Sequence, residues 1–314
     1  LDMSETGRAG HLVATRDGPG RKVLLIGHLD TVFEADSPFQ TFVRDGNTAT
    51  GPGVGDDKGG VVVILSALRA MQAAGTLEAA NITVFLTGDE ERTGAPLSIS
   101  RKDLIEAGKA ADFALEFEGL AMEDGKDFGT VARRSSTNWT LTTGGRTGHS
   151  SGVFNESLGF GAIYELSRIL DSFRRDLREP NLTYNVGVMA GGTPATLDAD
   201  GFRVTASGKT NIVAETAVAR GDLRALTPEQ ETRARDRMQA IVADHLPRTT
   251  AELAFGETGY PPMAPTEGNR DLLARLNAVN RDLGLPEMAE FDPARRGAAD
   301  SGFVAADVPT LGGL

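Results

Sequence analysis

The sequence contains no cysteine among its 314 residues. This absence excludes disulfide bonds and thiolate metal sites. Basic side chains are also relatively few, because 32 Lys and Arg stand against 44 Asp and Glu and leave a net charge of −12 at pH 7. A nucleic-acid-binding surface needs clustered Lys and Arg. We therefore expect no nucleic-acid partner.

Long hydrophobic runs are absent as well. No apolar stretch approaches the length that spans a membrane, and the opening residues Leu1-Asp2-Met3-Ser4 lack the features of a signal peptide. We expect no membrane partner, and both a cytoplasmic and a periplasmic location stay open. Residues 310–314 form a glycine-rich loop after an expected strand, so we expect the chain to be truncated at both ends.

Histidine and acidic side chains gather in four turns. These are Gly27-His28-Leu29-Asp30-Thr31, Gly55-Asp56-Asp57-Lys58-Gly59-Gly60, Gly88-Asp89-Glu90-Glu91 and Glu116-Phe117-Glu118. Three of them follow or end short apolar runs, which are typical of buried strands in a parallel sheet. Sites in open α/β sheets form beyond the carboxyl ends of the strands. We therefore expect these side chains to converge on one edge of one sheet.

Clustered carboxylates repel one another and are stabilised by a divalent cation. A mixture of imidazole and carboxylate favours zinc or a similar metal over calcium, which prefers oxygen ligands only. Each turn taken singly also has a structural alternative. His28 can be a core histidine, the Asp56-Asp57 turn a charged helix cap, and the Asp89-Glu90-Glu91 turn a solvated cap.

The pattern of elements predicts an interrupted fold. Strands and helices alternate up to residue 131 and resume near residue 258, which indicates an α/β domain with a mostly parallel sheet. Between them, residues 132–257 predict the order β-α-β-β-α-β of a ferredoxin-like unit. We therefore expect an α/β domain of residues 1–131 and 258–314 with an inserted α+β domain of residues 132–257.

Three motifs resemble a known family. The blocks Gly27-His28-Leu29-Asp30-Thr31-Val32, Gly51-Pro52-Gly53-Val54-Gly55-Asp56-Asp57-Lys58-Gly59-Gly60 and Thr87-Gly88-Asp89-Glu90-Glu91 are similar to the signature blocks of the M20 metallopeptidases. The similarity is greatest to glutamate carboxypeptidases, which remove C-terminal glutamate from folate-like compounds. It covers nearly the whole chain. The resemblance implies a zinc-binding catalytic domain interrupted by a ferredoxin-like lid that also forms a homodimer.

The resemblance implies a role for each matching residue. The metal ligands would be His28 and Glu118 on one zinc, Glu91 on the second, and Asp56 bridging both, with a cis peptide bond to Asp57. Glu90 would be the general base, and Asp30 would orient the His28 imidazole. The family's last zinc ligand is a histidine in a loop beyond Leu314, so one of the two zinc sites lacks a ligand within this chain.

In the inserted domain, the resemblance assigns substrate contacts to three residues. His149, in Gly148-His149-Ser150-Ser151, would reach into the partner subunit's site and stabilise the developing oxyanion. Asn211 and Arg224 would grip the substrate, with Arg224 on its free carboxylate. Arg133-Arg134 departs from the family pattern. It is interpreted as an exposed basic pair, with a second anionic-substrate contact as the alternative.

The resulting hypothesis is zinc-dependent hydrolysis of an amide bond next to a C-terminal amino acid in a small peptide or acyl-amino acid. One alternative is an N-acyl amino-acid deacylase or aminoacylase with the same metal centre. Another is a metal- and ligand-binding protein without catalysis. Sequencing the reading frame past Leu314 would discriminate between these hypotheses, because a histidine there favours an enzyme.

Overall fold

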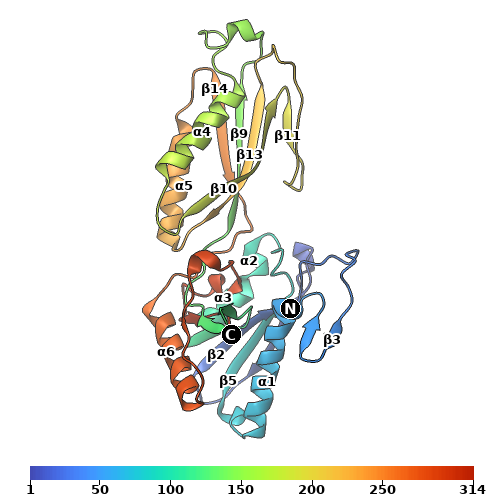
Figure 1. The fold of residues 1–314 in the computed structure, drawn as a ribbon, viewed down its shortest axis with the longest axis vertical. Coiled ribbons are helices and arrows are strands. Elements are labelled where there is room, and N and C mark those ends of the chain that lie inside the picture. Colours follow the sequence, from blue (N-terminus) through green and yellow to red (C-terminus); the bar gives the residue numbers. More distant parts are fainter. The chain divides into compact units, whose positions relative to one another are not determined.

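The computed structural model describes residues 1–314. The chain forms two compact units, which we call unit 1 (Leu1–Arg134 and Tyr260–Leu314) and unit 2 (Ser135–Gly259). Each unit has its own sheet and its own helices (Figure 1). No helix combines the length and the apolar character needed to cross a membrane.

Unit 1 is built on a five-stranded sheet. Its order is β1 (Leu12–Arg16), β5 (Asn81–Thr87), β2 (Lys22–His28), β6 (Phe113–Glu116) and β16 (Thr310–Leu311). Strand β1 runs antiparallel to β5, and the other neighbouring strands run parallel. The central strands β2 and β5 are buried on both faces, which explains why their sequences are nearly continuous apolar runs.

Helices cover both faces of this sheet. Leu25 packs in one core cluster with Ile64 of α1 (Gly59–Ala73), and α6 (Glu267–Asp282) packs on the same face through Leu273. Leu24 and Ile26 point to the opposite face, where they meet residues of α3 (Lys102–Lys109). Alternate residues of β2 therefore contact different helices. The short helix α2 (Leu97–Ser100) directly precedes α3.

The remaining elements of unit 1 are short. They are the hairpin of β3 (Val43–Asp45) and β4 (Thr48–Thr50), and the small sheet of β7 (Ala121–Glu123), β8 (Lys126–Gly129) and β15 (Ala289–Glu290). A 3-10 turn at Asp300–Phe303 packs under the main sheet through Phe303.

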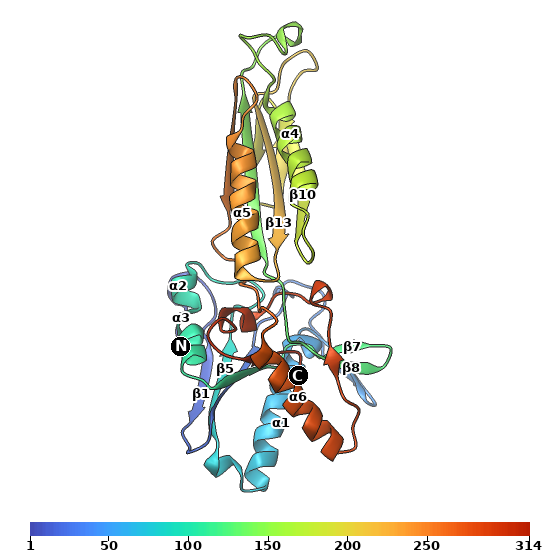
Figure 2. The same ribbon diagram turned by 90° about the vertical axis from the view of Figure 1, so that its left-hand side faces the viewer.

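Unit 2 contains a four-stranded antiparallel sheet of order β10-β13-β9-β14. Its main elements in chain order are β9 (Thr137–Gly145), α4 (Ala162–Asp176), β10 (Thr183–Gly192), β13 (Thr216–Arg224), α5 (Pro228–Ala243) and β14 (Thr249–Phe255). Both helices lie on the same face of the sheet (Figure 2) and share its core around Trp139. In chain order, a hairpin of β11 (Ala195–Leu197) and β12 (Val204–Ala206) follows β10 and precedes β13.

Local sequence signals explain the ends of the two helices of unit 2. Thr227 accepts a hydrogen bond from the N–H of Gln230 and precedes Pro228 at the first position of α5, a strong helix start. Helix α4 starts at Ala162, because Gly161 before it has a φ of 79°, which is not helical.

Candidate metal centre

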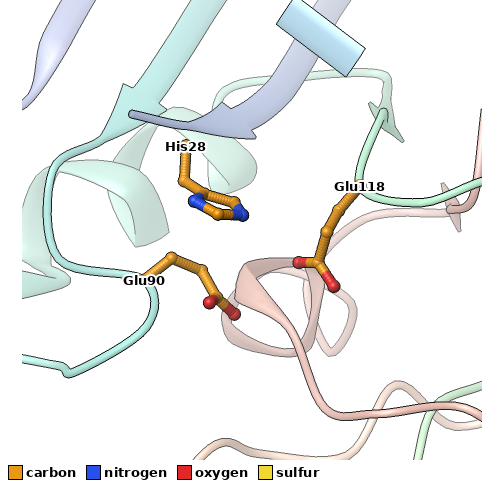
Figure 3. A group of neighbouring side chains, drawn as sticks. All are labelled: His28, Glu90 and Glu118. Carbon is orange, nitrogen blue, oxygen red and sulfur yellow. The ribbon is translucent and has the colours of Figure 1, made fainter. Parts of the chain in front are cut away.

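The acidic and histidine turns of unit 1 meet at one edge of its sheet. His28 is the last residue of β2 and pairs with Thr87, the last residue of β5. Glu90 lies just beyond β5, and Glu118 lies two residues beyond the end of β6. Because parallel strands end at the same edge, their following turns converge there. His28, Glu90 and Glu118 point toward one another in Figure 3.

Two groups of side chains have the spacing of metal ligands. One consists of His28, Glu90 and Glu118, and the other of His28, Asp56 and Glu91, with ligand atoms within 4.8 Å of one another in each group. His28 belongs to both groups. The sequence resemblance pairs Glu118 with Asp56, whereas the structure groups Glu118 with Glu90. The individual ligand roles therefore stay predictions.

Asp30 connects the histidine to the acidic turn. The Nδ1 atom of His28 lies 3.2 Å from the carbonyl oxygen of Asp30 and 3.4 Å from its carboxylate. The same carboxylate accepts hydrogen bonds from the backbone N–H groups of Glu90 (3.0 Å) and Glu91 (2.9 Å). On the other side of the ring, His28 Nε2 lies 2.7 Å from Asp56 Oδ1. Asp30 thus positions both the imidazole and the two glutamates.

Glycine is required around Asp57, which is buried beneath His28. The carboxylate of Asp57 accepts a hydrogen bond from the backbone N–H of His28. A Cβ atom at Gly27 would lie 2.6 Å from this carboxylate, and one at Gly60 would lie 2.1 Å from the carbonyl oxygen of Phe117. The Asp56–Asp57 peptide bond is cis, as the resemblance implies.

A buried ionic network supports the acidic turn from below. Arg101 is fully buried and donates to the carboxylate of Asp89 (2.5 Å), to its carbonyl oxygen (3.1 Å) and to Asp300 (2.9 Å). His11 accepts a hydrogen bond from the N–H of Gly88, so this histidine supports the turn. Tyr260 donates its hydroxyl hydrogen to the carbonyl oxygen of Glu90. The sequence analysis missed Arg101, Tyr260 and Asp300, because no local pattern links them to the turn.

The site holds more negative charge than the surrounding protein neutralises. Burial and the charges of Glu118 and Asp300 raise the pKa of Glu90 to about 10. Burial raises the pKa of Glu118 to about 8, although Arg133 opposes the change. Burial lowers the pKa of His28, but hydrogen bonds to Asp30 and Asp56 and the charge of Glu90 outweigh it and raise the pKa to about 12. Without a cation, these side chains reduce their negative charge by binding protons. A divalent metal would neutralise them instead, and the set of imidazole and carboxylate groups fits such a metal.

The interpretation of Arg133-Arg134 as an exposed pair is wrong. Arg133 is 1% exposed and Arg134 is 8% exposed. The guanidinium of Arg133 lies 2.8 Å from Glu116 and 3.5 Å from Glu118. Glu116 is itself buried, and a buried carboxylate needs a paired charge. Arg133 therefore belongs to the interior of unit 1, beside the candidate metal centre.

The three candidate residues of unit 2 do not lie together in one chain. His149 is exposed and its neighbour Ser150 donates a backbone hydrogen bond to the carbonyl oxygen of Asn211, which precedes the start of β13. Arg224 is the last residue of β13 and donates to Asp222 (2.8 Å). Strand β13 has nine residues, so Asn211 and Arg224 are separated by on the order of 30 Å at the usual rise per residue.

Comparison with known proteins places the chain in a family. The model of peptidase family M20/M25/M40 matches residues 24–314. The chain belongs to this family. It is 32% identical over 194 residues to carboxypeptidase G2 of Pseudomonas sp. strain RS-16, which covers 58% of this chain and 44% of that protein. It is 34% identical over 152 residues to a succinyl-diaminopimelate desuccinylase of Xanthomonas oryzae pv. oryzae, covering 46% of this chain and 40% of that enzyme.

The fold of this M20 chain has solved counterparts. The crystal structure of aminopeptidase PepT from Bacillus cereus superimposes with a TM-score of 0.71 at 19% sequence identity, covering 99% of this chain and 78% of that one. At this identity the similarity concerns the fold alone. The chain spans less than half the length of the two curated relatives above.

Proposed function

We propose that this M20 protein hydrolyses the amide bond next to a C-terminal amino acid, as a metal-dependent carboxypeptidase of the glutamate type. One observation carries the proposal. Two ligand groups that share His28 lie at the carboxyl edge of the sheet, where buried carboxylates lack enough protein cations to neutralise them. Family membership supports the same conclusion.

We propose that His28, Asp56, Glu91 and Glu118 hold two divalent cations, with zinc as the expected metal. Such ions would polarise the substrate carbonyl and lower the pKa of bound water. The imidazole supplies one neutral ligand and the carboxylates supply the charge, a combination that suits zinc. Three contacts of the Asp30 carboxylate fix the imidazole of His28 and the Glu90-Glu91 turn relative to each other.

Glu90 is proposed as the general base. Glu90 is 9% exposed, and its backbone is held on both sides, at the N–H by Asp30 and at the carbonyl oxygen by Tyr260. Cations bound at the site would favour the ionised form of Glu90, and this carboxylate could then take a proton from the attacking water and pass it to the leaving amine nitrogen.

Unit 2 is proposed as a lid and dimerisation domain. His149 and Asn211 lie at one end of β13 and Arg224 at the other, so a single copy of unit 2 presents them far apart. In a homodimer, Arg224 of one subunit and His149 of the other can serve the same site. His149 would then donate a hydrogen bond to the developing oxyanion, while Arg224 holds the free carboxylate of the substrate.

The closest competing activity is deacylation of N-acyl amino acids, since the relatives include a desuccinylase as well as a carboxypeptidase. A panel of acyl-glutamates, dipeptides and N-acyl or N-succinyl amino acids, assayed with zinc, manganese or cobalt, separates the two. We expect turnover of acyl-glutamates that a chelator abolishes and metal restores. Faster turnover of substrates with small N-acyl groups would favour the deacylase. Binding of metal without turnover of any substrate would favour the non-catalytic alternative.

A further inference from the structure

Arg133 is a buried charged side chain of unit 1 that the proposed mechanism does not use. It is 1% exposed, so its guanidinium cannot bind a substrate anion. Its backbone N–H and carbonyl group both pair with Met263, at 2.9 and 3.0 Å, which fixes the position of the side chain's base. A buried arginine held this firmly has a defined target within the protein.

Two glutamates are the targets of this guanidinium. Nη2 lies 2.8 Å from Oε2 of Glu116, and Nη1 lies 3.5 Å from Oε1 of Glu118. Nη2 also donates to the carbonyl oxygen of Glu118 (3.2 Å), and Nη1 donates to that of Gly297 (3.0 Å). Arg133 therefore contacts Glu118 at both its side chain and its main chain.

Glu116 balances the charge of Arg133. It is fully buried, and its other carboxylate oxygen accepts a hydrogen bond from the N–H of Ser301 (2.9 Å). The Arg133–Glu116 pair is thus close to neutral as a unit. It adds little positive charge to the adjacent metal centre, so its effect on Glu118 comes mainly from geometry.

We propose that Arg133 is a positioning residue that makes Glu118 a ligand through one oxygen atom. Arg133 Nη1 lies 3.5 Å from Oε1 of Glu118, so the other oxygen would bind the metal; the Glu118 carboxylate points toward His28 and Glu90 (Figure 3). Replacing the hydrogen-bond partner of a metal ligand commonly weakens metal binding by about 10-fold to 100-fold. This inference rests on the metal centre of the proposed function.

Arg296 provides a matched comparison. Its Nη2 donates to the carbonyl oxygens of Glu118 (3.0 Å) and Gly119 (2.8 Å), so it holds the same turn through the main chain. No contact joins it to the Glu118 carboxylate. If support of the turn were sufficient, changes at Arg296 and Arg133 would have similar effects on metal binding.

The test measures zinc binding to the purified protein by competition with a coloured chelator. Arg133→Lys keeps the charge but loses the fork of donors. The pair Glu116→Gln with Arg133→Met removes both charges, so no unpaired buried glutamate remains to prevent folding. We expect zinc to bind about 10-fold to 100-fold more weakly in both proteins, while Arg296→Lys binds zinc as the unchanged protein does. Thermal unfolding in the presence of chelator checks that each variant is folded.

Glu118→Gln completes the test as a double-mutant cycle. With a glutamine at position 118, the changes at Arg133 should weaken zinc binding no further, because Arg133 acts through the Glu118 carboxylate. Equal zinc affinity of the Arg133 variants and the unchanged protein would overturn the inference, and so would the same loss in the Glu118→Gln background. Failure of the unchanged protein to bind zinc would instead overturn the proposed function and this inference together.

Discussion

The candidate residues of unit 1 and those of unit 2 differ in how far the fold brings them together. In unit 1, side chains from three other turns, up to about ninety residues away in the sequence, reach ligand distance of His28. In unit 2, His149 and Asn211 are neighbours, but Arg224 lies at the other end of the same strand. Parallel strands bring their ends to one edge, whereas residues at the two ends of one strand stay apart.

This difference separates the proposed site residues that one chain supplies from those that two copies would share. The proposed metal ligands and the proposed base all belong to one copy of unit 1. The residues proposed to contact substrate are divided between two ends of unit 2, which is the arrangement expected if two copies share them. The experiments below separate what one chain does from what two copies do.

The largest effect is expected at Glu90. Replacing Glu90 by Gln should lower kcat by about 100-fold to 10,000-fold, because the carboxylate that accepts the proton is lost while its shape is kept. Zinc binding should stay largely intact. The measurement is turnover of an acyl-glutamate together with the zinc content of the purified variant.

Glu91 is the matched control for this change. It is the adjacent residue in the same turn and belongs to the other ligand group. Glu91→Gln should reduce zinc content as well as turnover. If Glu90→Gln loses zinc to the same degree, Glu90 is a ligand and its assignment as the base is wrong. Near-normal turnover of Glu90→Gln would also remove that assignment.

The next effect tests the sharing of unit 2 between copies. His149→Ala should lower kcat by about 100-fold to 1,000-fold, the usual cost of losing one donor to an oxyanion. Mixing this variant with Glu90→Gln should partly restore activity, since a hybrid dimer has one site with both residues intact. The assay follows activity against the ratio of the two variants, with each variant alone as the control. A mixture no more active than its components would contradict the shared site.

Sequence patterns located the candidate metal centre but not the buried side chains that support its turns. The apolar runs before His28 and Asp89 predicted strands, and the rule for strand ends predicted that the turns converge. Arg101 and Asp300, by contrast, are separated by 199 residues and contact each other in the core. A buried pair of this kind leaves no periodic or local signal in the sequence.

Arg133 shows why a local interpretation fails. Two adjacent arginines are usually exposed, because burying a guanidinium costs free energy unless a carboxylate compensates it. The compensating residue, Glu116, ends β6, and Ser301, which holds Glu116, comes from the distant 3-10 turn. The burial of Arg133 therefore depends on tertiary contacts, which a pattern of neighbouring residues does not contain.

A smaller effect is expected at Arg224, the residue at the far end of β13. Arg224→Lys should raise KM by about 10-fold for substrates with a free C-terminal carboxylate and change kcat little, because a bidentate contact becomes a single one. An amide-capped substrate should lose this difference. Arg220 lies earlier in β13 on the same face of the strand, and its side chain donates a hydrogen bond to the carbonyl oxygen of Gly201. Arg220→Lys therefore serves as the control. An equal rise in KM for Arg220→Lys would mean that Arg224 has no specific role.

The smallest effect concerns stability and pH. In the metal-free protein, the pKa values of Glu90, Glu118 and Asp57 are raised to about 10, 8 and 7, from 4.5, 4.5 and 3.8. A raised pKa contributes stability that is complete at low pH and is lost as the pH rises through the folded value. The pKa of His28, raised from 6.5 to about 12, has the same sign. Between about pH 5 and about pH 8, the folded state therefore binds more protons than the unfolded state, and stability falls as the pH rises.

A bound metal replaces these protons, so the metal-loaded protein should not share this loss. The lowered pKa of Asp30 and that of Asp56 act only below their ordinary value of 3.8 and do not reverse the trend. We expect the difference in Tm between zinc-loaded and chelator-treated protein to grow by several degrees from about pH 5 to about pH 8. Glu118→Gln should reduce this growth, because it removes one of the titrating groups. A constant difference across the range would mean that the acidic cluster is neutralised by the protein itself, and the electrostatic argument for a metal would fail.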